Sequence, residues 1–222
     1  MAQGRFITFE GGEGTGKSTQ VRLLAEKLRS IGREVVVTRE PGGTPFAEQV
    51  RGLILAPDVA EHTPLSEALL FYAARADHID KVIRPALERG CDVVCDRFSD
   101  STRIYQTVAG TLPLEQFQML EDVVVAATRP ALTIILDLPA VEGLSRTVAR
   151  RQQKSVGADA AARADRFEAR DLNFHETLRQ GFLDLARAEP QRCVVINAAQ
   201  AVEVVASDIW QEIVARWLAE VR

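Results

Sequence analysis

A glycine-rich segment between a predicted strand and a predicted helix constrains the fold of this sequence more than any other feature. Residues 11–18 read GGEGTGKS and fit the pattern G-x-x-x-x-G-K-[ST]. Residues 5–10 alternate as a strand does, whereas 17–30 carries apolar residues at helical spacing before Gly32. In this setting the glycines let successive backbone N–H groups face one anion at the positive end of the helix. The segment is therefore predicted to bind phosphate.

The polar side chains of this loop have separate predicted roles. Lys17 reaches the β- and γ-phosphates of a nucleoside triphosphate, and the Ser18 hydroxyl is offered to Mg²⁺. Mg²⁺ is therefore the expected cofactor. The residues predicted to bind the nucleotide are Gly11, Gly12, Glu13, Gly14, Thr15, Gly16, Lys17, Ser18 and Thr19.

Short apolar segments separated by helical stretches predict an α/β fold. One helix is expected around 46–55, and a longer one starts with Thr63 as its cap and Pro64 at its first position. This alternation favours three layers, with a parallel five-stranded sheet flanked by helices and ligands at the carboxyl ends of the strands. The predicted strands are 5–10, 34–38, 92–96, 132–137 and 193–197.

Composition excludes several classes of protein. The 27 Lys and Arg residues face 31 Asp and Glu residues, a net charge of −4, which argues against nucleic acid or anionic lipid as a partner. No apolar run approaches the ~20 residues of a membrane span, so a cytoplasmic location is expected. Cys91, Cys95 and Cys193 lack the spacing of a zinc site and are expected to be buried thiols.

Several residues, including those at the end of the predicted strand 92–96, narrow the kind of phosphate chemistry that this chain can carry out. A regulatory GTPase carries Asn-Lys-x-Asp, but neither Asn173 nor Asn197 is followed by lysine. Many ATPases place a glutamate after the acidic residue of their second motif, where this chain has Arg97 after Asp96. The planar guanidinium of an arginine holds a phosphate at two points and favours a second anionic substrate over an attacking water. An ATP-dependent switch remains the alternative from another class.

Four segments in this order together resemble the bacterial thymidylate kinase family. They are residues 10–20 (EGGEGTGKSTQ), 38–44 (TREPGGT), 70–75 (LFYAAR) and 96–106 (DRFSDSTRIYQ), and the similarity extends from residue 5 to about 215. The resemblance implies one P-loop kinase domain over 1–222 that transfers the γ-phosphate of ATP to dTMP, giving dTDP and ADP. It also implies a homodimer, with the helix 114–127 as the expected contact. A related kinase acting on dUMP, UMP or AMP is the nearest alternative.

The resemblance assigns roles to individual residues. Phe71 and Arg75 lie four apart on one helix face, where they would stack on thymine and hydrogen-bond its carbonyl edge. Asp96 would arrange the magnesium with its waters, and Arg97 would hold the acceptor phosphate and act in catalysis with Lys17. The predicted substrate-binding set comprises Glu13, Arg39, Pro41, Arg51, Phe71, Arg75, Arg97, Ser101, Thr102, Tyr105 and Gln106.

A break in composition marks a predicted lid. Residues 152–162 are rich in Ala, Gln and charge, and they lie within an expected mobile lid at about 146–168. Because Glu13 occupies a P-loop position where some relatives have arginine, the resemblance implies that the lid supplies the catalytic arginine. Arg150 and Arg151 are the predicted choices. The wider candidates also include Arg146, Arg163 and Arg166.

Overall fold

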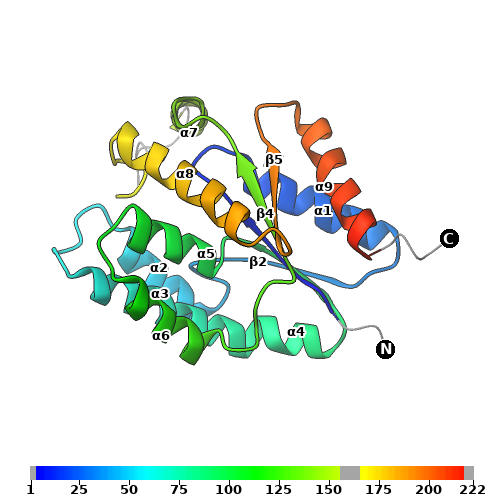
Figure 1. Ribbon diagram of the computed structural model, residues 1–222, viewed down its shortest axis with the longest axis horizontal. Helices are drawn as coiled ribbons and strands as arrows, with labels where there is room; N and C mark the ends of the chain where they lie inside the picture. Colours follow the sequence, from blue (N-terminus) through cyan, green and yellow to red (C-terminus); the bar gives the residue numbers. More distant parts are fainter. Residues whose placement is uncertain (1–3, 156–165, 218–222) are drawn as a thin grey trace.

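The computed structural model describes residues 4–155 and 166–217, and within them one sheet organises the chain. Its strands are parallel and lie in the order β2-β3-β1-β4-β5 (Figure 1). The three-layer α/β architecture with a five-stranded parallel sheet is thus confirmed. Every strand lies within one residue of its predicted range. The strands are β1 Phe6–Glu10, β2 Val35–Arg39, β3 Asp92–Asp96, β4 Leu132–Asp137 and β5 Cys193–Asn197.

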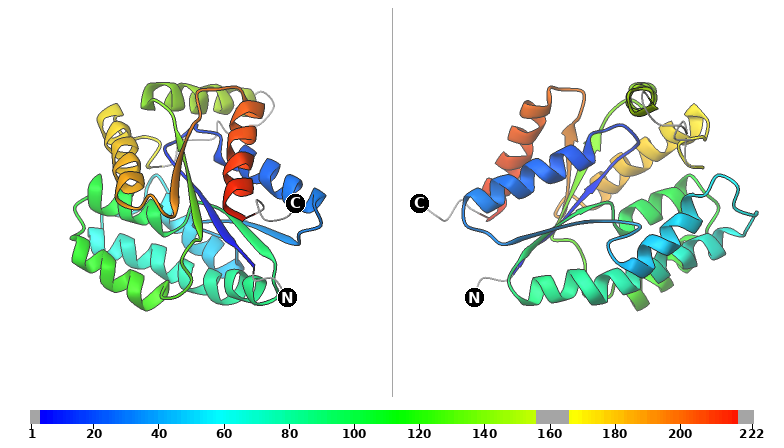
Figure 2. Two further views of the ribbon diagram at one scale, coloured as in Figure 1. Left: turned by 45° about the vertical axis from the view of Figure 1, so that its right-hand side comes forward. Right: turned by 180° about the vertical axis from the view of Figure 1, so that it is seen from behind.

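The helices flank this sheet on both faces (Figures 1 and 2). Thr44 and Thr63 cap the second and third helices: their hydroxyls accept hydrogen bonds from the N–H groups of Ala47 and Ser66, and proline follows each cap. Two π-helical segments, η1 Ile79–Ile83 and η2 Arg103–Val108, continue α3 and α5. The helices are α1 Lys17–Ser30, α2 Pro45–Leu55, α3 Pro64–His78, α4 Arg84–Glu88, α5 Ser99–Thr102, α6 Leu114–Val124, α7 Ala140–Ser155, α8 Leu172–Ala188 and α9 Val202–Trp217.

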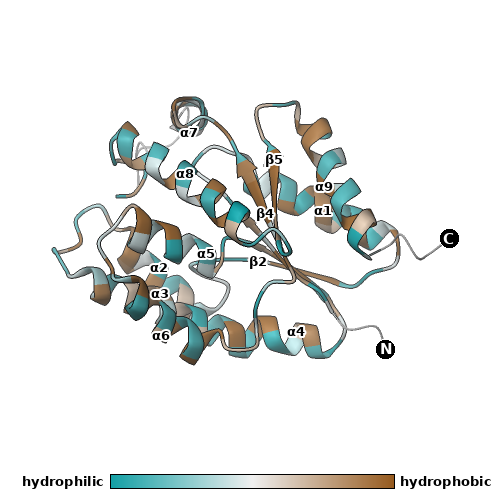
Figure 3. Ribbon diagram, viewed as in Figure 1, coloured by the Kyte–Doolittle hydropathy of each residue, from teal (hydrophilic) through white to brown (hydrophobic). Residues whose placement is uncertain are grey.

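The strands are apolar because both faces of the sheet are covered (Figure 3). On β1, Ile7 and Phe9 pack under α1 and α9, whereas Phe6 points to the opposite face and joins a cluster with Tyr72 and Ile83. A third cluster lies between α8 and the sheet. On the outer side of the first cluster, α9 buries Val205, Ile209 and Ile213.

The register of the strands brings the functional segments together. Phe9 of β1 pairs with Asp96 of β3, which also pairs with Arg39 of β2. The P-loop, the segment after Asp96 and the segment after Arg39 therefore leave the sheet at neighbouring carboxyl ends. This edge is where a parallel sheet collects its ligands.

The structure also bears on the predictions for the cysteines, for the helix 114–127 and for membrane spans. The three cysteines are buried and free, as predicted. The helix expected at 114–127 ends at Val124, and Ala126 has a positive φ of 48°, which a continuing helix does not allow. No helix in the described ranges combines the length and the apolar character that a bilayer crossing requires.

Candidate active site

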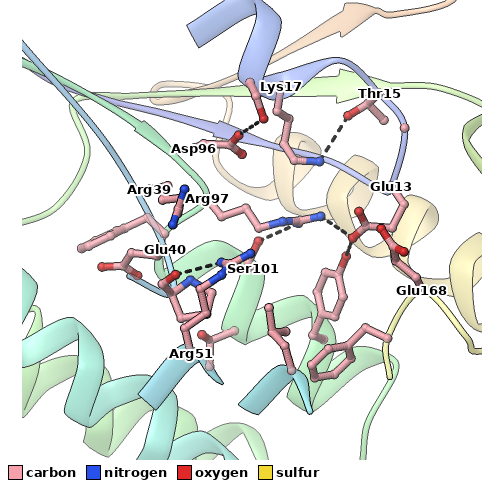
Figure 4. A pocket seen from close by; sticks show the side chains of 18 of the residues that line it. Glu13, Thr15, Lys17, Arg39, Glu40, Arg51, Asp96, Arg97, Ser101 and Glu168 are labelled. Atoms are coloured by element: carbon pink, nitrogen blue, oxygen red, sulfur yellow. Dashed lines mark hydrogen bonds and ion pairs between the residues drawn. The ribbon is translucent and has the colours of Figure 1, made fainter. Parts of the chain in front are cut away.

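A pocket of about 470 Å³ opens at the carboxyl ends of β1, β2 and β3 (Figure 4). Most of the predicted site residues line it, but among the described residues Gly11, Gly12 and Arg151 do not. Five other lining residues were not among the predicted site residues: Glu40, Leu55, Phe98, Phe167 and Glu168. The predicted residues that line the pocket are Glu13, Gly14, Thr15, Gly16, Lys17, Ser18, Thr19, Arg39, Pro41, Arg51, Phe71, Arg75, Asp96, Arg97, Ser101, Thr102, Tyr105, Gln106 and Arg150.

The P-loop wraps around the ammonium group of Lys17. Its Nζ donates to the carbonyl oxygens of Gly11 and Gly12 at 3.1 and 2.7 Å and to Thr15 Oγ1 at 3.3 Å. Burial, together with the charge of Arg97, lowers the pKa of Lys17 to about 8. Gly11 must be glycine: its φ is +128°, and a Cβ would lie 2.4 Å from the carbonyl oxygen of Leu136 on β4.

A hydroxyl and a carboxylate meet beside the start of α1. Ser18 Oγ donates to Asp96 Oδ2 at 2.6 Å (Figure 4). Hard oxygen donors of this kind suit Mg²⁺, which is commonly held by one or two protein oxygens together with waters and substrate phosphates. Within the described residues, no group of three or more His, Cys, Asp or Glu side chains could hold a metal ion alone. The donor set therefore fits a magnesium ion that arrives with nucleotide phosphates.

Arg97 joins the P-loop to the segment after β3. Its NH1 donates to the Gly11 carbonyl at 3.1 Å and to Ser101 Oγ at 3.0 Å, and its NH2 donates to Glu13 Oε1 at 2.6 Å (Figure 4). The Tyr105 hydroxyl donates to the same Glu13 oxygen. Burial opposes ionisation of Glu13, but Arg97, Lys17 and Tyr105 outweigh it and lower the pKa to about 2. Glu13 is therefore an anion at neutral pH.

The backbone of Arg97 is held in an unusual conformation by Glu10. Arg97 has a φ of 67°, a region that few residues other than glycine adopt. The fully buried carboxylate of Glu10 accepts hydrogen bonds from the Phe98 N–H at 2.8 Å and from Ser101 Oγ at 2.5 Å. Burial, with the charge of Asp100 nearby, raises the pKa of Glu10 to about 7. An acidic residue at the end of an apolar strand is the sequence signal that could have identified this support.

Arg75 is buried rather than exposed on its helix face. Its Nε donates to Glu40 Oε2 at 2.8 Å and its NH2 donates to Thr102 Oγ1 at 2.9 Å. Within the described part of the chain, the buried NH1 has no hydrogen-bond partner, although Arg75 lines the pocket. Half-buried Phe71 lines the same wall, one helical turn before Arg75. Phe71 and Arg75 thus line one wall, and Arg75 keeps one donor that no described atom engages.

Other residues of the predicted substrate-binding set also lie around the pocket. Arg39 forms an exposed ion pair with Glu48 at 3.0 Å, and Arg51 donates to the Pro41 carbonyl at 2.9 Å. Gln106 Nε2 donates to Glu67 Oε1 at 2.8 Å, and the ring of Tyr105 packs against Phe167. These residues line the pocket in their present rotamers, except Glu48 and Glu67.

The predicted lid arginines lie on and after α7. Arg150 lines the pocket, and its guanidinium is 3.8 Å from Glu168, which Arg151 also approaches at 3.9 Å. Arg146 lines the pocket as well, and it donates to the carbonyl oxygen of Ala198 after β5. Arg166 pairs with Glu67, and neither residue lines the pocket. Arg163 lies outside the described residues.

The fold and the pocket define a class of protein. A P-loop between the central strand and the following helix, with a second cation-rich wall facing it, is the arrangement of a P-loop phosphotransferase with two substrate sites. Residues 9–209 match the model of the family "Thymidylate kinase". This chain therefore belongs to the thymidylate kinase family.

Individual relatives agree with this family. The chain is 50% identical to the thymidylate kinase of Caulobacter vibrioides over 216 residues, which cover 97% of this chain and 99% of the relative. It is 49% identical to the thymidylate kinase of Nitrobacter winogradskyi over 208 residues, covering 94% and 87%. The crystal structure of the Ehrlichia chaffeensis thymidylate kinase superposes with a TM-score of 0.74 at 34% identity, covering 95% and 99% of the two chains.

Proposed function

We propose that this chain is an ATP-dependent kinase that transfers the γ-phosphate of ATP to dTMP and releases dTDP and ADP. One observation carries the proposal: the P-loop lysine and the wall that bears Phe71, Arg75 and Arg97 line one pocket. Family membership favours dTMP over dUMP, UMP or AMP as the acceptor, and it favours transfer to an acceptor over a switch that only hydrolyses ATP.

The acceptor is expected on the wall formed by α3 and α5. Phe71 provides a surface on which a base stacks, and the free NH1 donor of Arg75 suits a carbonyl oxygen at the edge of that base. Arg97 suits the phosphate of the acceptor, because its guanidinium lies between Glu13 and Ser101 in the middle of the pocket. The further proposed contacts are Arg39, Pro41, Arg51, Thr102, Tyr105 and Gln106.

Transfer between the two nucleotides requires no general base. A phosphate monoester has a second pKa of about 6, so the acceptor oxygen is already anionic at neutral pH. The obstacle is repulsion, since two unit charges ~4 Å apart at an effective dielectric near 20 repel by roughly 4 kcal/mol. The cations Lys17 and Arg97 offset this repulsion and align the reacting oxygens. Arg150 is the proposed third cation, and Arg151 is the second choice for this role.

Magnesium is the proposed cofactor of this reaction. Ser18 and Asp96 would hold the ion, directly or through water, because their oxygens meet at 2.6 Å beside the P-loop. When bound, the ion would neutralise negative charge on the phosphates of ATP.

The remaining proposals concern the organisation of the protein. Residues 146–168, of which 156–165 lie outside the described ranges, are proposed as a lid on a single domain, since Arg146, Arg150 and Glu168 line the pocket. A homodimer through α6 is supported by the exposed apolar side chains of Leu114, Met119 and Val123. A cytoplasmic location stays a prediction.

Coupled detection of ADP tests the proposed reaction. We expect turnover with ATP, Mg²⁺ and dTMP, and a rise in KM for dTMP of roughly 10-fold or more in Phe71→Ala, because base stacking contributes ~1–3 kcal/mol. Arg97→Ala should lose dTMP-dependent turnover while the dissociation constant of ATP changes little.

The control is Phe46→Ala, which removes an exposed ring on α2 that does not line the pocket. Its kinetics should match the wild type. A panel with dUMP, UMP and AMP separates the alternative acceptors. ATP turnover that is indifferent to every added monophosphate would contradict the proposal.

A further inference from the structure

A buried histidine lies directly behind the acceptor wall. His78 is the last residue of α3, its side chain is 0% exposed, and it is not among the described residues that line the pocket. Its Nδ1 lies 2.9 Å from Glu40 Oε1, and its Nε2 lies 2.6 Å from Thr38 Oγ1. An ionised carboxylate only accepts hydrogen bonds, so Nδ1 carries the proton and donates to Glu40.

Glu40 passes this contact on to Arg75. One carboxylate oxygen, Oε1, accepts from His78, and the other, Oε2, accepts from Arg75 Nε at 2.8 Å. The backbone N–H of Glu40 donates to the carbonyl oxygen of Asp96, which fixes the residue to the end of β3. Thr38, His78, Glu40 and Arg75 thus form one continuous chain of hydrogen bonds.

Close packing keeps this chain of hydrogen bonds in place. Gly43 has a φ of +89°, and a Cβ there would lie 2.6 Å from the His78 ring and 2.7 Å from Thr38 Oγ1. The Arg75 guanidinium carbon also lies over the rings of Tyr72 and Phe98, 4.7 and 5.2 Å from their centroids. With Nε and NH2 engaged, the guanidinium can rotate little, and NH1 is left with a defined direction.

We propose that His78 is a positioning residue for recognition of the acceptor base. It orients the Glu40 carboxylate, which holds the Arg75 guanidinium in the wall of the pocket, and it does not itself touch the ligand. This inference rests on the proposed function, in which Arg75 faces the base of dTMP. Without the Nδ1 donor, the Glu40 carboxylate could rotate about its bond to the side chain. The guanidinium of Arg75 would then lose its fixed orientation.

Two substitutions of His78 test the role. His78→Phe keeps a ring and removes both hydrogen bonds, whereas His78→Asn places an amide donor close to the position of Nδ1. Since a hydrogen bond to a charged group contributes ~1.5–3 kcal/mol, we expect KM for dTMP to rise about 10-fold or more in His78→Phe. KM for ATP should stay unchanged, and His78→Asn should restore most of the dTMP affinity.

A double-mutant cycle with Arg75→Met distinguishes positioning from general damage to the fold. If His78 acts through Arg75, His78→Phe adds no further loss of dTMP affinity in the Arg75→Met background. Thr38→Val, which removes only the far hydroxyl, provides a milder variant if His78→Phe does not fold, and it should show the same dependence on Arg75.

Equal penalties in both backgrounds, or a parallel rise in both KM values, would overturn the positioning role. The activity of the wild-type protein distinguishes failure of the proposed function from failure of the proposed role of His78. Absence of dTMP-dependent turnover in the wild type contradicts the proposed function itself, whereas normal wild-type turnover with uncoupled variants contradicts only the role of His78.

Discussion

At the scale of single residues, the pocket balances its own charges before a ligand binds. Glu13 neutralises Arg97 at 2.6 Å, and the carbonyl oxygens of Gly11 and Gly12 surround the ammonium group of Lys17. An incoming phosphate must compete with these internal partners. The two ionised groups differ in how firmly they hold their charge. The pKa of Glu13 is lowered to about 2, so Glu13 stays ionised at neutral pH, whereas the pKa of Lys17 is lowered to about 8, so Lys17 loses its proton more readily than an ordinary lysine.

The lowered pKa of Lys17 predicts that ATP affinity depends on pH. Only the protonated amine attracts phosphate, and it is lost as the pH rises through about 8. Bound phosphates would stabilise the protonated form, so the dissociation constant of ATP should rise on the order of tenfold between pH 7 and 9. Isothermal titration calorimetry across this range measures the effect. Lys17→Met should bind ATP weakly with a nearly flat profile, and a flat wild-type profile would contradict the assignment.

Residue by residue, the motif segments contained both the side chains that line the pocket and those that support them, but the sequence assigned roles only to the first kind. The motif letters were enough to place Lys17 and Arg97 at a phosphate site. The tie between Glu40 and Arg75 depends on α3 packing against the end of β2, a contact between residues 35 positions apart. No local pattern encodes such a contact.

At the scale of elements, α7 touches the P-loop backbone to backbone. A Cβ on Gly143 of α7 would lie 2.2 Å from the carbonyl oxygen of Glu13, and a Cβ on Gly14 would lie 2.0 Å from the carbonyl oxygen of Gly143. The Thr147 hydroxyl also donates to that second oxygen. This glycine contact sets how closely the helix that carries Arg146 and Arg150 approaches the phosphate loop.

Gly143→Ala should therefore impair catalysis although alanine is the better helix former. The methyl group meets backbone that cannot move aside, so α7 must shift, and a small misplacement of catalytic groups can lower rates ~100-fold. We expect kcat to fall at least 10-fold, with KM for dTMP within twofold of the wild type. Gly52→Ala is the matched control, since a Cβ there meets no described atom within 4 Å. It should keep full activity and gain up to about 1 kcal/mol of stability.

Periodicity predicted the existence of most elements better than their internal geometry. The helix expected after Thr63 is present, but it passes through the π-helical segment Ile79–Ile83 before α4. The apolar spacing that identifies a helix does not distinguish an α-helical turn from a π-helical one. The turns from Ser99 to Val108 were also not predicted as helical, because Ser, Asp and Thr at their start favour caps and loops.

At the scale of the whole molecule, a polar cluster joins β1, β4 and α5 to the residue that precedes β5. Arg192, which precedes β5, donates to both oxygens of Asp100 at 2.7 and 2.8 Å and to Thr133 Oγ1 on β4 at 2.7 Å. Thr133 in turn shares a hydrogen bond with Thr8 on β1. The cluster links the edge strand to the helix that follows Arg97.

Removing the cation of this cluster should destabilise the entire fold. Arg192→Ala leaves the Asp100 side chain, which is only 6% exposed, without its partner. Breaking a buried pair in this way costs several kcal/mol, so we expect the free energy of unfolding in urea to fall by about 2–4 kcal/mol. The control is Arg22→Ala, which breaks an ion pair whose side chains are 61% and 53% exposed and should cost less than about 1 kcal/mol. Equal losses in the two variants would contradict the structural role of the cluster.

The contact between Gly14 and Gly143 also restricts how this chain can evolve. At most packed positions, a larger side chain on one element is accommodated by a smaller one on its neighbour. Here each glycine packs against main-chain atoms of the other element. Neither side of the contact has a side chain that could be made smaller to create space. A larger residue at one position therefore cannot be compensated by a substitution at the other. Both glycines must be kept for as long as α7 packs against the P-loop.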